Sequence, residues 1–156
     1  MSNPSLLNWE TASSNPPAIP YLSMFTGADG LSSIAPCVLG GFAPGHVGAG
    51  PSLWSRPFPG EVERVQFNLL PVGWVGDWHE SPVAQWVVPL SGRWFVEMQD
   101  GACVEMGPGD IHWGQDLGTI ETEWGRGHRS GTLGDQPCVL LAIRFKAPIG
   151  EGRCPF

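Results

Sequence analysis

The residues of this chain best suited to chemistry lie near its middle, where four polar side chains are separated by even numbers of positions: Asp77, His79, Ser81 and Gln85. Side chains with this spacing point to one face of an extended backbone. His128 follows a loop that contains several glycines, and the fold can bring it against that face. Two imidazoles and an amide oxygen can hold a divalent metal. Without a metal, the imidazoles can act as a general acid and base.

Length and composition indicate the kind of domain that must position these residues. The 156 residues correspond to about one domain. The 22 Gly and 16 Pro favour turns over long helices, and the 8 Trp and 7 Phe supply apolar surface that a disordered chain lacks. The composition therefore predicts a folded, turn-rich, mostly β domain.

The charge and the cysteines restrict the partners and the compartment. A formal net charge of −7 argues against nucleic acid and against a membrane surface, because both are themselves anionic. No apolar run approaches the ~18 residues of a membrane span, and no basic region followed by an apolar run marks a signal peptide. Cys37, Cys103, Cys138 and Cys154 lack the spacing of a zinc site. We expect a cytoplasmic protein with reduced thiols, in which Cys103 and Cys138 are small core residues.

Short apolar or alternating runs bounded by glycine and proline predict strands, at residues 21–26, 31–39, 52–56, 61–70, 85–90, 93–98, 102–106, 111–114 and 139–145. Loops are expected at 40–50 and 115–127, and His128 begins a further strand or its edge. Strands this short and this closely spaced are typical of a sandwich or barrel.

The chain is expected to form one domain, at residues 21–147. Residues 1–20 contain four prolines and are predicted to be a tail that packs on the domain through Leu6, Leu7 and Trp9. Residues 148–156 are predicted to form a second tail.

The central stretch resembles the first motif of the cupin superfamily, in which Gly is followed by five residues, His-x-His, three or four residues, Glu, six residues and Gly. Here Gly73, His79 and Gly92 stand at the motif positions, with Ser81 at the second His and Gln85 at the Glu. The spacing fits throughout, and two of the three ligand types differ.

The second cupin motif is matched more loosely. Gly107-Pro108-Gly109-Asp110 resembles its start and His128 its terminal His, but the interval between them is longer than usual and the internal Pro-x-Gly is absent. Residues 73–145 also resemble small bacterial and fungal cupins that carry Trp-His at the first motif, Gln in place of Glu, and Gly-x-Gly-His-Arg at the second.

The resemblance implies a single cupin domain, an all-β RmlC-like jelly-roll barrel, and a homodimer that pairs through its sheets. It also implies that His79, Gln85 and His128 face the cavity and hold a divalent metal (Zn, Mn, Ni or Fe). Because this set lacks an anionic ligand, Lewis-acid or proton-transfer chemistry suits it better than oxygen activation. We therefore expect an isomerase or lyase in which Asp77 or His112 moves the proton. Strand parity places Asp77 inward and Glu80 outward.

Three alternatives stay open: a metal-free acid/base enzyme built on His79 and His128, a non-catalytic binding or sensing module, and a non-haem iron dioxygenase. The expected partner is a small molecule, either aromatic or carboxylate-bearing. Arg126 and Arg129 flank His128 and can meet a carboxylate. The residues expected to line the substrate pocket are Trp78, Ser81, Gln66, Asn68, Trp94 and Arg129.

Overall fold

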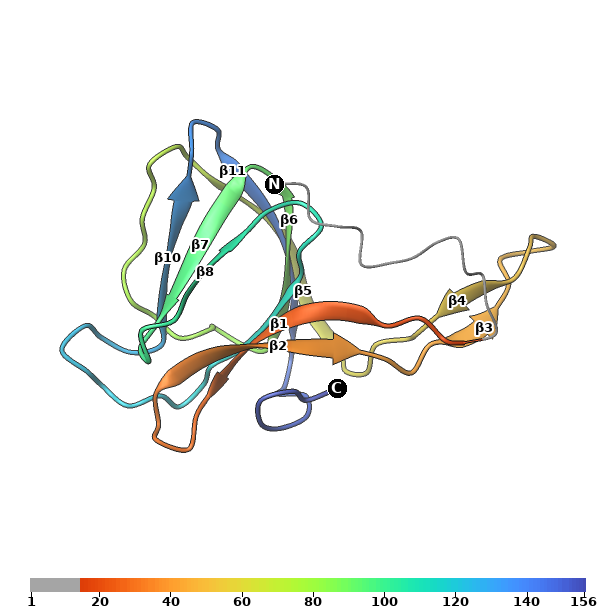
Figure 1. The fold of residues 1–156 in the computed structure, drawn as a ribbon, viewed down its shortest axis with the longest axis horizontal. Coiled ribbons are helices and arrows are strands. Elements are labelled where there is room, and N and C mark those ends of the chain that lie inside the picture. The colour runs from red at the N-terminus through yellow and green to blue at the C-terminus, as the bar shows by residue number, and fades with distance from the viewer. Residues whose placement is uncertain (1–14) are drawn as a thin grey trace.

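The computed structural model describes residues 15–156, and every helix or strand element in that range is a strand (Figure 1). The strands are β1 (Ile19–Thr26), β2 (Ser32–Leu39), β3 (Ala43–Gly45), β4 (Leu53–Ser55), β5 (Val62–Leu70), β6 (Gln85–Ser91), β7 (Arg93–Met98), β8 (Cys103–Met106), β9 (His112–Gln115), β10 (His128–Leu133) and β11 (Cys138–Phe145). The predicted all-β class is confirmed. The described residues contain no helix long and apolar enough to cross a membrane.

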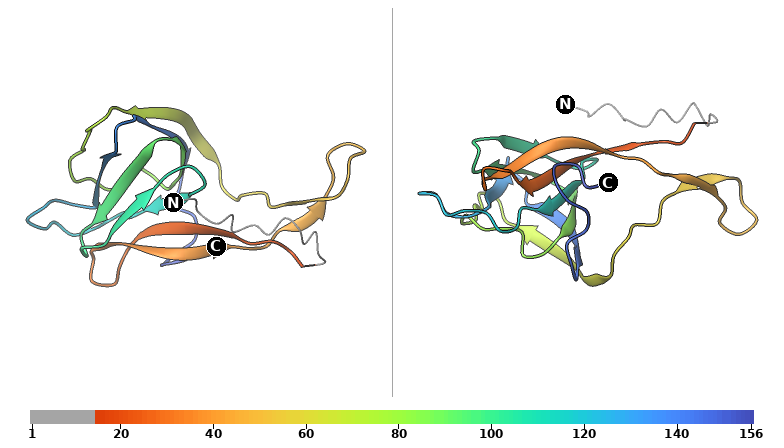
Figure 2. Two further views of the ribbon diagram at one scale, coloured as in Figure 1. Left: turned by 45° about the horizontal axis from the view of Figure 1, so that its top comes forward. Right: turned by 90° about the horizontal axis from the view of Figure 1, so that it is seen from below.

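The strands form two main sheets and a small hairpin. The larger sheet has six strands in the order β2-β1-β9-β6-β11-β5, and the smaller has three in the order β10-β7-β8. All pairings are antiparallel except β1 with β9, so the larger sheet is mixed. The β3–β4 hairpin extends away from the body, as Figure 2 shows. The predicted loop at 40–50 therefore contains one strand of this hairpin.

Local sequence explains where the strands begin, end and lie. Pro36 sits inside β2, and β2 is an edge strand, where the missing N–H costs no ladder hydrogen bond. Gly92 joins β6 to β7 with a φ of 73°. A Cβ at this position would lie 2.2 Å from the carbonyl oxygen of Pro137, so the turn requires glycine.

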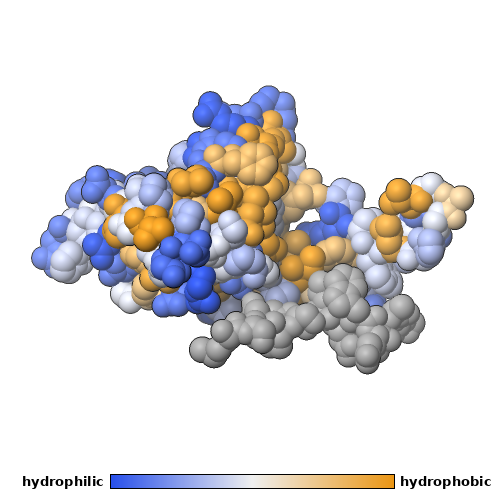
Figure 3. Space-filling view, turned by 90° about the horizontal axis from the view of Figure 1, so that it is seen from above, coloured by the Kyte–Doolittle hydropathy of each residue, from blue (hydrophilic) through white to orange (hydrophobic). Residues whose placement is uncertain are grey.

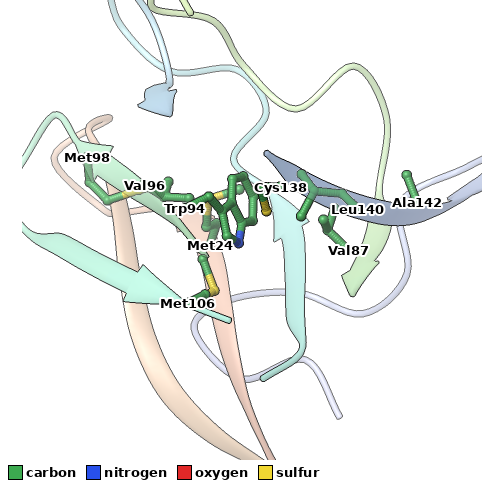
Figure 4. Packing of buried hydrophobic residues seen from close by; sticks show 9 residues of the cluster. All are labelled: Met24, Val87, Trp94, Val96, Met98, Met106, Cys138, Leu140 and Ala142. Atoms are coloured by element: carbon green, nitrogen blue, oxygen red, sulfur yellow. The ribbon is translucent and has the colours of Figure 1, made fainter. Parts of the chain in front are cut away.

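The core has two parts. A cluster drawn from both main sheets surrounds Trp94 and is shown in Figure 4: Met24, Val87, Trp94, Val96, Met98, Met106, Cys138, Leu140 and Ala142. An aromatic cluster lies around Trp86 and Trp113, with Tyr21 and Phe145 packed against them. Each fully buried large side chain of this kind contributes roughly 1.5–3 kcal/mol. Trp86 and Trp113 are therefore core residues rather than pocket residues.

The C-terminal segment is bound to the body at two points. Phe156 packs into the aromatic cluster, 4.8 Å from Phe58 and 5.0 Å from Trp113 between ring centroids. Cys154 forms a disulfide with Cys37, 117 residues away. The expectation of reduced thiols is wrong for this pair, because the fold brings together two cysteines whose sequence spacing gives no sign of it. In the chain-entropy model, closing a loop of this length stabilises the fold by ~4–5 kcal/mol.

The other two cysteines are free and differ from each other. Cys138 is buried, as predicted, whereas Cys103 is exposed, so the prediction of a core residue is wrong there. The predicted N-terminal tail contacts through Leu6, Leu7 and Trp9 lie outside the described residues. Ile19 and Pro20, assigned to that tail, belong to β1.

Candidate functional site

A cavity of about 780 Å³ lies between the two main sheets. Six of the residues predicted to face a pocket line it: Gln66, Asn68, His79, Gln85, Trp94 and His128. His112, one of the two residues expected to move the proton, lines the cavity as well. Among the lining residues, His79 is exposed and His112 is 1% exposed, so the cavity extends from the surface to the buried core.

His128 is held by a buried carboxylate. Its Nδ1 lies 2.6 Å from Oδ2 of Asp116, and the two side chains are 6% and 0% exposed. Oδ1 of Asp116 accepts hydrogen bonds from the backbone N–H of Ser81 at 3.0 Å and from its hydroxyl at 2.6 Å. Both carboxylate oxygens therefore have donors, which a buried charge requires.

The protonation states of this pair follow from the hydrogen bonds. Burial raises the pKa of Asp116, but the hydrogen bond and charge of His128 and the two hydrogen bonds from Ser81 outweigh it, so the pKa lies below its usual value. An ionised carboxylate only accepts hydrogen bonds, so Nδ1 of His128 must carry the proton. In the neutral form of the ring, the lone pair is therefore on the other nitrogen, Nε2.

His79 is oriented in a similar way. Its Nδ1 lies 2.8 Å from the carbonyl oxygen of Asp77, which can only accept, so this nitrogen also carries the proton. Its ring centroid is 4.6 Å from that of His128. The two backbones form a β-bridge with reciprocal hydrogen bonds of 2.8 Å. The chain therefore fixes two imidazoles side by side, and in the neutral form of each ring the lone pair is on Nε2.

His112 is a different kind of residue. Burial, and then the charge of His128, lower its pKa to about 3, while Asp116 opposes the shift. Neither ring nitrogen has a hydrogen-bond partner among the described residues, and the ring lies 5.4 Å from that of Trp94. His112 is therefore neutral at physiological pH, so it does not donate a proton as an imidazolium.

The donor set fits a divalent metal poorly. Gln85, the third ligand implied by the cupin resemblance, accepts a hydrogen bond at its Oε1 from Nε of Arg144, at 3.2 Å. A cation bound to that oxygen would be repelled by the guanidinium. Within residues 15–156, no group of three His, Cys, Asp or Glu side chains could hold a metal ion.

No family model matches the chain, and none of the curated proteins matches it. Among solved structures, the chain is similar to the crystal structure of protein NMB1881 from Neisseria meningitidis, at 18% sequence identity. The match covers 59% of this chain and 88% of that one, with a TM-score of 0.40. A likeness at this level bears on neither fold nor function.

The prediction that the side chain of Asp77 points inward and that of Glu80 outward is wrong. Asp77 is exposed and does not line the cavity, whereas Glu80 does. The carboxylate of Glu80 accepts hydrogen bonds from the backbone N–H and hydroxyl of Thr119, at 2.6 and 2.7 Å. The parity argument fails because residues 77–84 are not a continuous strand, with bends at 82–84 before β6 begins.

Three other expected pocket residues lie outside the cavity. Ser81 is buried against Asp116 and positions that carboxylate. Arg129 pairs with Glu97, at 2.5 Å, and its guanidinium lies 5.8 Å from the ring centroid of Trp78. Neither Arg129 nor Trp78 lines the cavity. Arg126, the other arginine beside His128, pairs with Glu121 at 2.8 Å.

Sequence reasoning missed two residues of this site. Asp116 lies in the loop expected at 115–127, and the available signal was a lone carboxylate directly after a strand. Arg144 lies in the strongly apolar run 139–145, where a charged side chain on the same face as Leu140 and Ala142 was the signal.

Proposed function

We propose that the protein is an acid–base enzyme that moves a proton on a small organic molecule bound in the cavity between its sheets. The observation that carries the proposal is the Asp116–His128 pair, a buried carboxylate 2.6 Å from Nδ1 of an imidazole, which leaves Nε2 as the nitrogen that can accept a proton. A carboxylate in this position orients the imidazole, holds its tautomer and stabilises the imidazolium that forms when Nε2 takes a proton.

The pair of imidazoles suits an isomerisation or an elimination. One Nε2 removes a proton from a carbon next to a carbonyl. The other imidazole, protonated from solvent, delivers a proton to a neighbouring carbon or to a leaving oxygen. The gain from such positioned proton transfer is typically 10²–10⁴-fold. Gln66, Asn68 and Gln85 supply amides on the cavity wall to orient the substrate.

We propose further that the two sheets form a cupin-type jelly-roll barrel around the cavity. The spacing of Gly73, His79, Gln85 and Gly92 supports this proposal, as does the inward position of His79, Gln85 and His128. A cytoplasmic location remains part of the proposal. The Cys37–Cys154 disulfide is an observation against it, since such bonds are characteristic of oxidising compartments.

A second candidate keeps the fold and adds a divalent metal (Zn, Mn, Ni or Fe). The favouring observation is that both Nδ1–H groups are bonded to oxygen, which is how metal-ligating histidines are held. His79 and His128 would hold the ion. Gln85 would have to give up its hydrogen bond from Arg144 before its Oε1 could bind the ion. Iron–oxygen chemistry is the weaker form of this candidate, because its usual site includes a carboxylate ligand.

The test is proton exchange on a carbon acid, measured by NMR as loss of the C3 protons of phenylpyruvate in D₂O. We expect exchange that persists after dialysis against a chelator and falls at least 10²-fold in His128→Asn. His46→Asn is the matched control, because His46 lies in the β3–β4 hairpin.

Other outcomes point elsewhere. Exchange that is abolished by chelation and restored by one added metal, with elemental analysis showing that metal in the purified protein, supports the second candidate. Tight binding with no exchange on any of a panel of carbon acids overturns the enzyme proposal in favour of a binding or sensing module.

The outer face of β5 supports the predicted homodimer. Val65, Phe67 and Leu69 are 56%, 70% and 63% exposed, and each lies beside a half-buried apolar residue of β11. Figure 3 shows hydrophobic residues gathered in a strip up the middle of one face of the molecule. Apolar patches of this kind on a folded domain mark interaction sites. β5 is also the edge strand of its sheet. In a dimer with two-fold symmetry, each copy would cover the same apolar face of the other.

Phe67→Glu is therefore expected to convert a dimer to a monomer, because it places a charge in the centre of the covered face. Light scattering coupled to gel filtration measures the mass directly. Glu63→Gln, an exposed position on the same strand, is the control and leaves the dimer intact. A monomeric wild-type protein at high micromolar concentration contradicts the homodimer.

A further inference from the structure

We propose that the substrate carries a carboxylate, that Arg144 binds it inside the cavity, and that the charge of the neighbouring, exposed Arg64 assists. The inference rests on the proposed function, since it names the substrate class of the same site. It differs from the sequence expectation, which gives this role to Arg126 and Arg129.

Arg144 is the arginine that lines the cavity. It lies on the inward face of β11, on the same side as Leu140 and Ala142, which also line the cavity. Its Nε donates to Oε1 of Gln85, its cross-strand neighbour on β6. This hydrogen bond leaves the two terminal nitrogens of the guanidinium for a ligand. A guanidinium fork presents parallel N–H groups that match the two oxygens of a carboxylate.

Arg64 stands directly opposite Arg144 on β5. Arg64 is exposed and does not itself line the cavity, but it shares the strand parity of Gln66 and Asn68, which do. Like charges in directly opposed positions of neighbouring strands destabilise a sheet. Among the described residues, no carboxylate forms a salt bridge with Arg64 or Arg144. An anion at this end of the cavity would remove the repulsion.

The other charged groups near the cavity do not fill this role. Three surface arginines, Arg93, Arg126 and Arg129, each have a glutamate partner. The carboxylate of Glu80 lines the cavity but is bonded to Thr119. In a chain with a net charge of −7, two opposed arginines without a carboxylate form a local positive site. Steering of an anionic substrate to this end places the rest of the molecule toward His79 and His128.

The test compares an acid with its neutral ester. Trp74 and Trp94 line the cavity, so quenching of tryptophan fluorescence reports binding of phenylpyruvate and of methyl phenylpyruvate. We expect the wild-type protein to bind the acid more tightly than the ester. Arg144→Gln is expected to weaken acid binding by about 10–100-fold, the range for a hydrogen-bonded charge, and to leave ester binding unchanged.

Two further variants and one control sharpen the result. Arg64→Gln is expected to weaken acid binding by up to about fivefold, because a charge in a more exposed position contributes less. Arg144→Lys keeps the charge without the fork and is expected to fall between wild type and Arg144→Gln. Arg93→Gln, whose partner Glu105 lies on β8, is the matched control and binds as the wild type does. Thermal unfolding of each variant verifies that it is folded.

The outcomes separate this inference from the proposed function. If acid and ester bind equally, or if folded Arg144→Gln binds the acid as tightly as wild type, the carboxylate site is overturned. Proton exchange that continues in that case leaves the acid–base proposal standing. Binding that depends on Arg144, without proton exchange on any carbon acid, supports the carboxylate site and overturns the enzyme.

Discussion

Replacement of Asp116 with Asn is expected to lower the rate of proton exchange by about 10²–10⁴-fold, the largest loss from a residue that does not touch the substrate. Asp116 acts as a positioning residue. Its Oδ1 accepts from the backbone N–H of Ser81, a donor that cannot be removed. In Asp116→Asn, the amide oxygen is expected to accept the hydrogen bond from this N–H. The NH₂ group of the amide then faces Nδ1 of His128.

This arrangement reverses the tautomer of His128. A donor facing Nδ1 requires that nitrogen to hold a lone pair, so the proton moves to Nε2. Nε2, the nitrogen not bonded to residue 116, then carries a proton and is no longer a base. The substitution also removes the negative charge that stabilises the imidazolium in the wild-type protein.

Three measurements distinguish this role from a structural one. ¹⁵N chemical shifts of the imidazole are expected to show Nδ1–H in the wild-type protein and Nε2–H in Asp116→Asn. The exchange rate falls while the affinity for phenylpyruvate changes little. Asp135→Asn, at an exposed turn between β10 and β11, is the control. An unchanged tautomer together with an unchanged rate would remove Asp116 from the mechanism.

The strands could be predicted well because their signals are local. Residues 93–98 were expected as a strand from a short run that follows Gly92 and ends before Gly101, and β7 spans the same residues. Residues 61–70 were expected as a strand from their alternation of apolar and polar side chains, and β5 begins one residue later. Alternation does not say which face meets the interior, however. In β5 the half-buried Gln66 and Asn68 line the cavity, whereas Phe67 and Leu69, which also border it, are largely exposed.

The site could be predicted only in part, because its decisive contacts are not local. His79, Gln85 and His128 were found from residue type and motif spacing, and all three line the cavity. The hydrogen bond from His128 to Asp116 joins the start of a strand to a loop 12 residues earlier, where no periodicity exists to place a side chain. The Cys37–Cys154 disulfide spans 117 residues for the same reason. Such contacts depend on tertiary packing that no window of the sequence contains.

Mild acid is expected to lower the free energy of unfolding of the protein strongly. The pKa of His112 is lowered from 6.5 to about 3 in the folded protein, chiefly by burial. Between these pH values the unfolded chain binds a proton at His112 and the folded protein does not. The contribution of His112 to the free energy of unfolding is therefore unaffected above pH 6.5. Below that pH it makes the folded protein less stable, by about 1.4 kcal/mol for each pH unit. Over the whole window the loss is on the order of 4–5 kcal/mol, a large share of the stability of a small domain.

His112→Phe is expected to remove this dependence, because a phenyl ring of similar shape cannot be protonated. The free energy of unfolding by urea, measured at pH 7, 6, 5 and 4.5, should fall steeply in the wild-type protein and more gently in the variant. Asp116 does not disturb the comparison, since its pKa is also lowered and its contribution is lost only below about pH 4.

His46→Asn, at an exposed loop position, is the control and follows the wild-type curve. Parallel curves for wild type and His112→Phe would show that His112 binds a proton as readily in the folded protein as in the unfolded chain. At neutral pH the variant loses no hydrogen bond, because neither ring nitrogen of His112 has a partner among the described residues. Its effect on stability at that pH is therefore expected to be small, and the difference between the two proteins should appear only as the pH falls below 6.5.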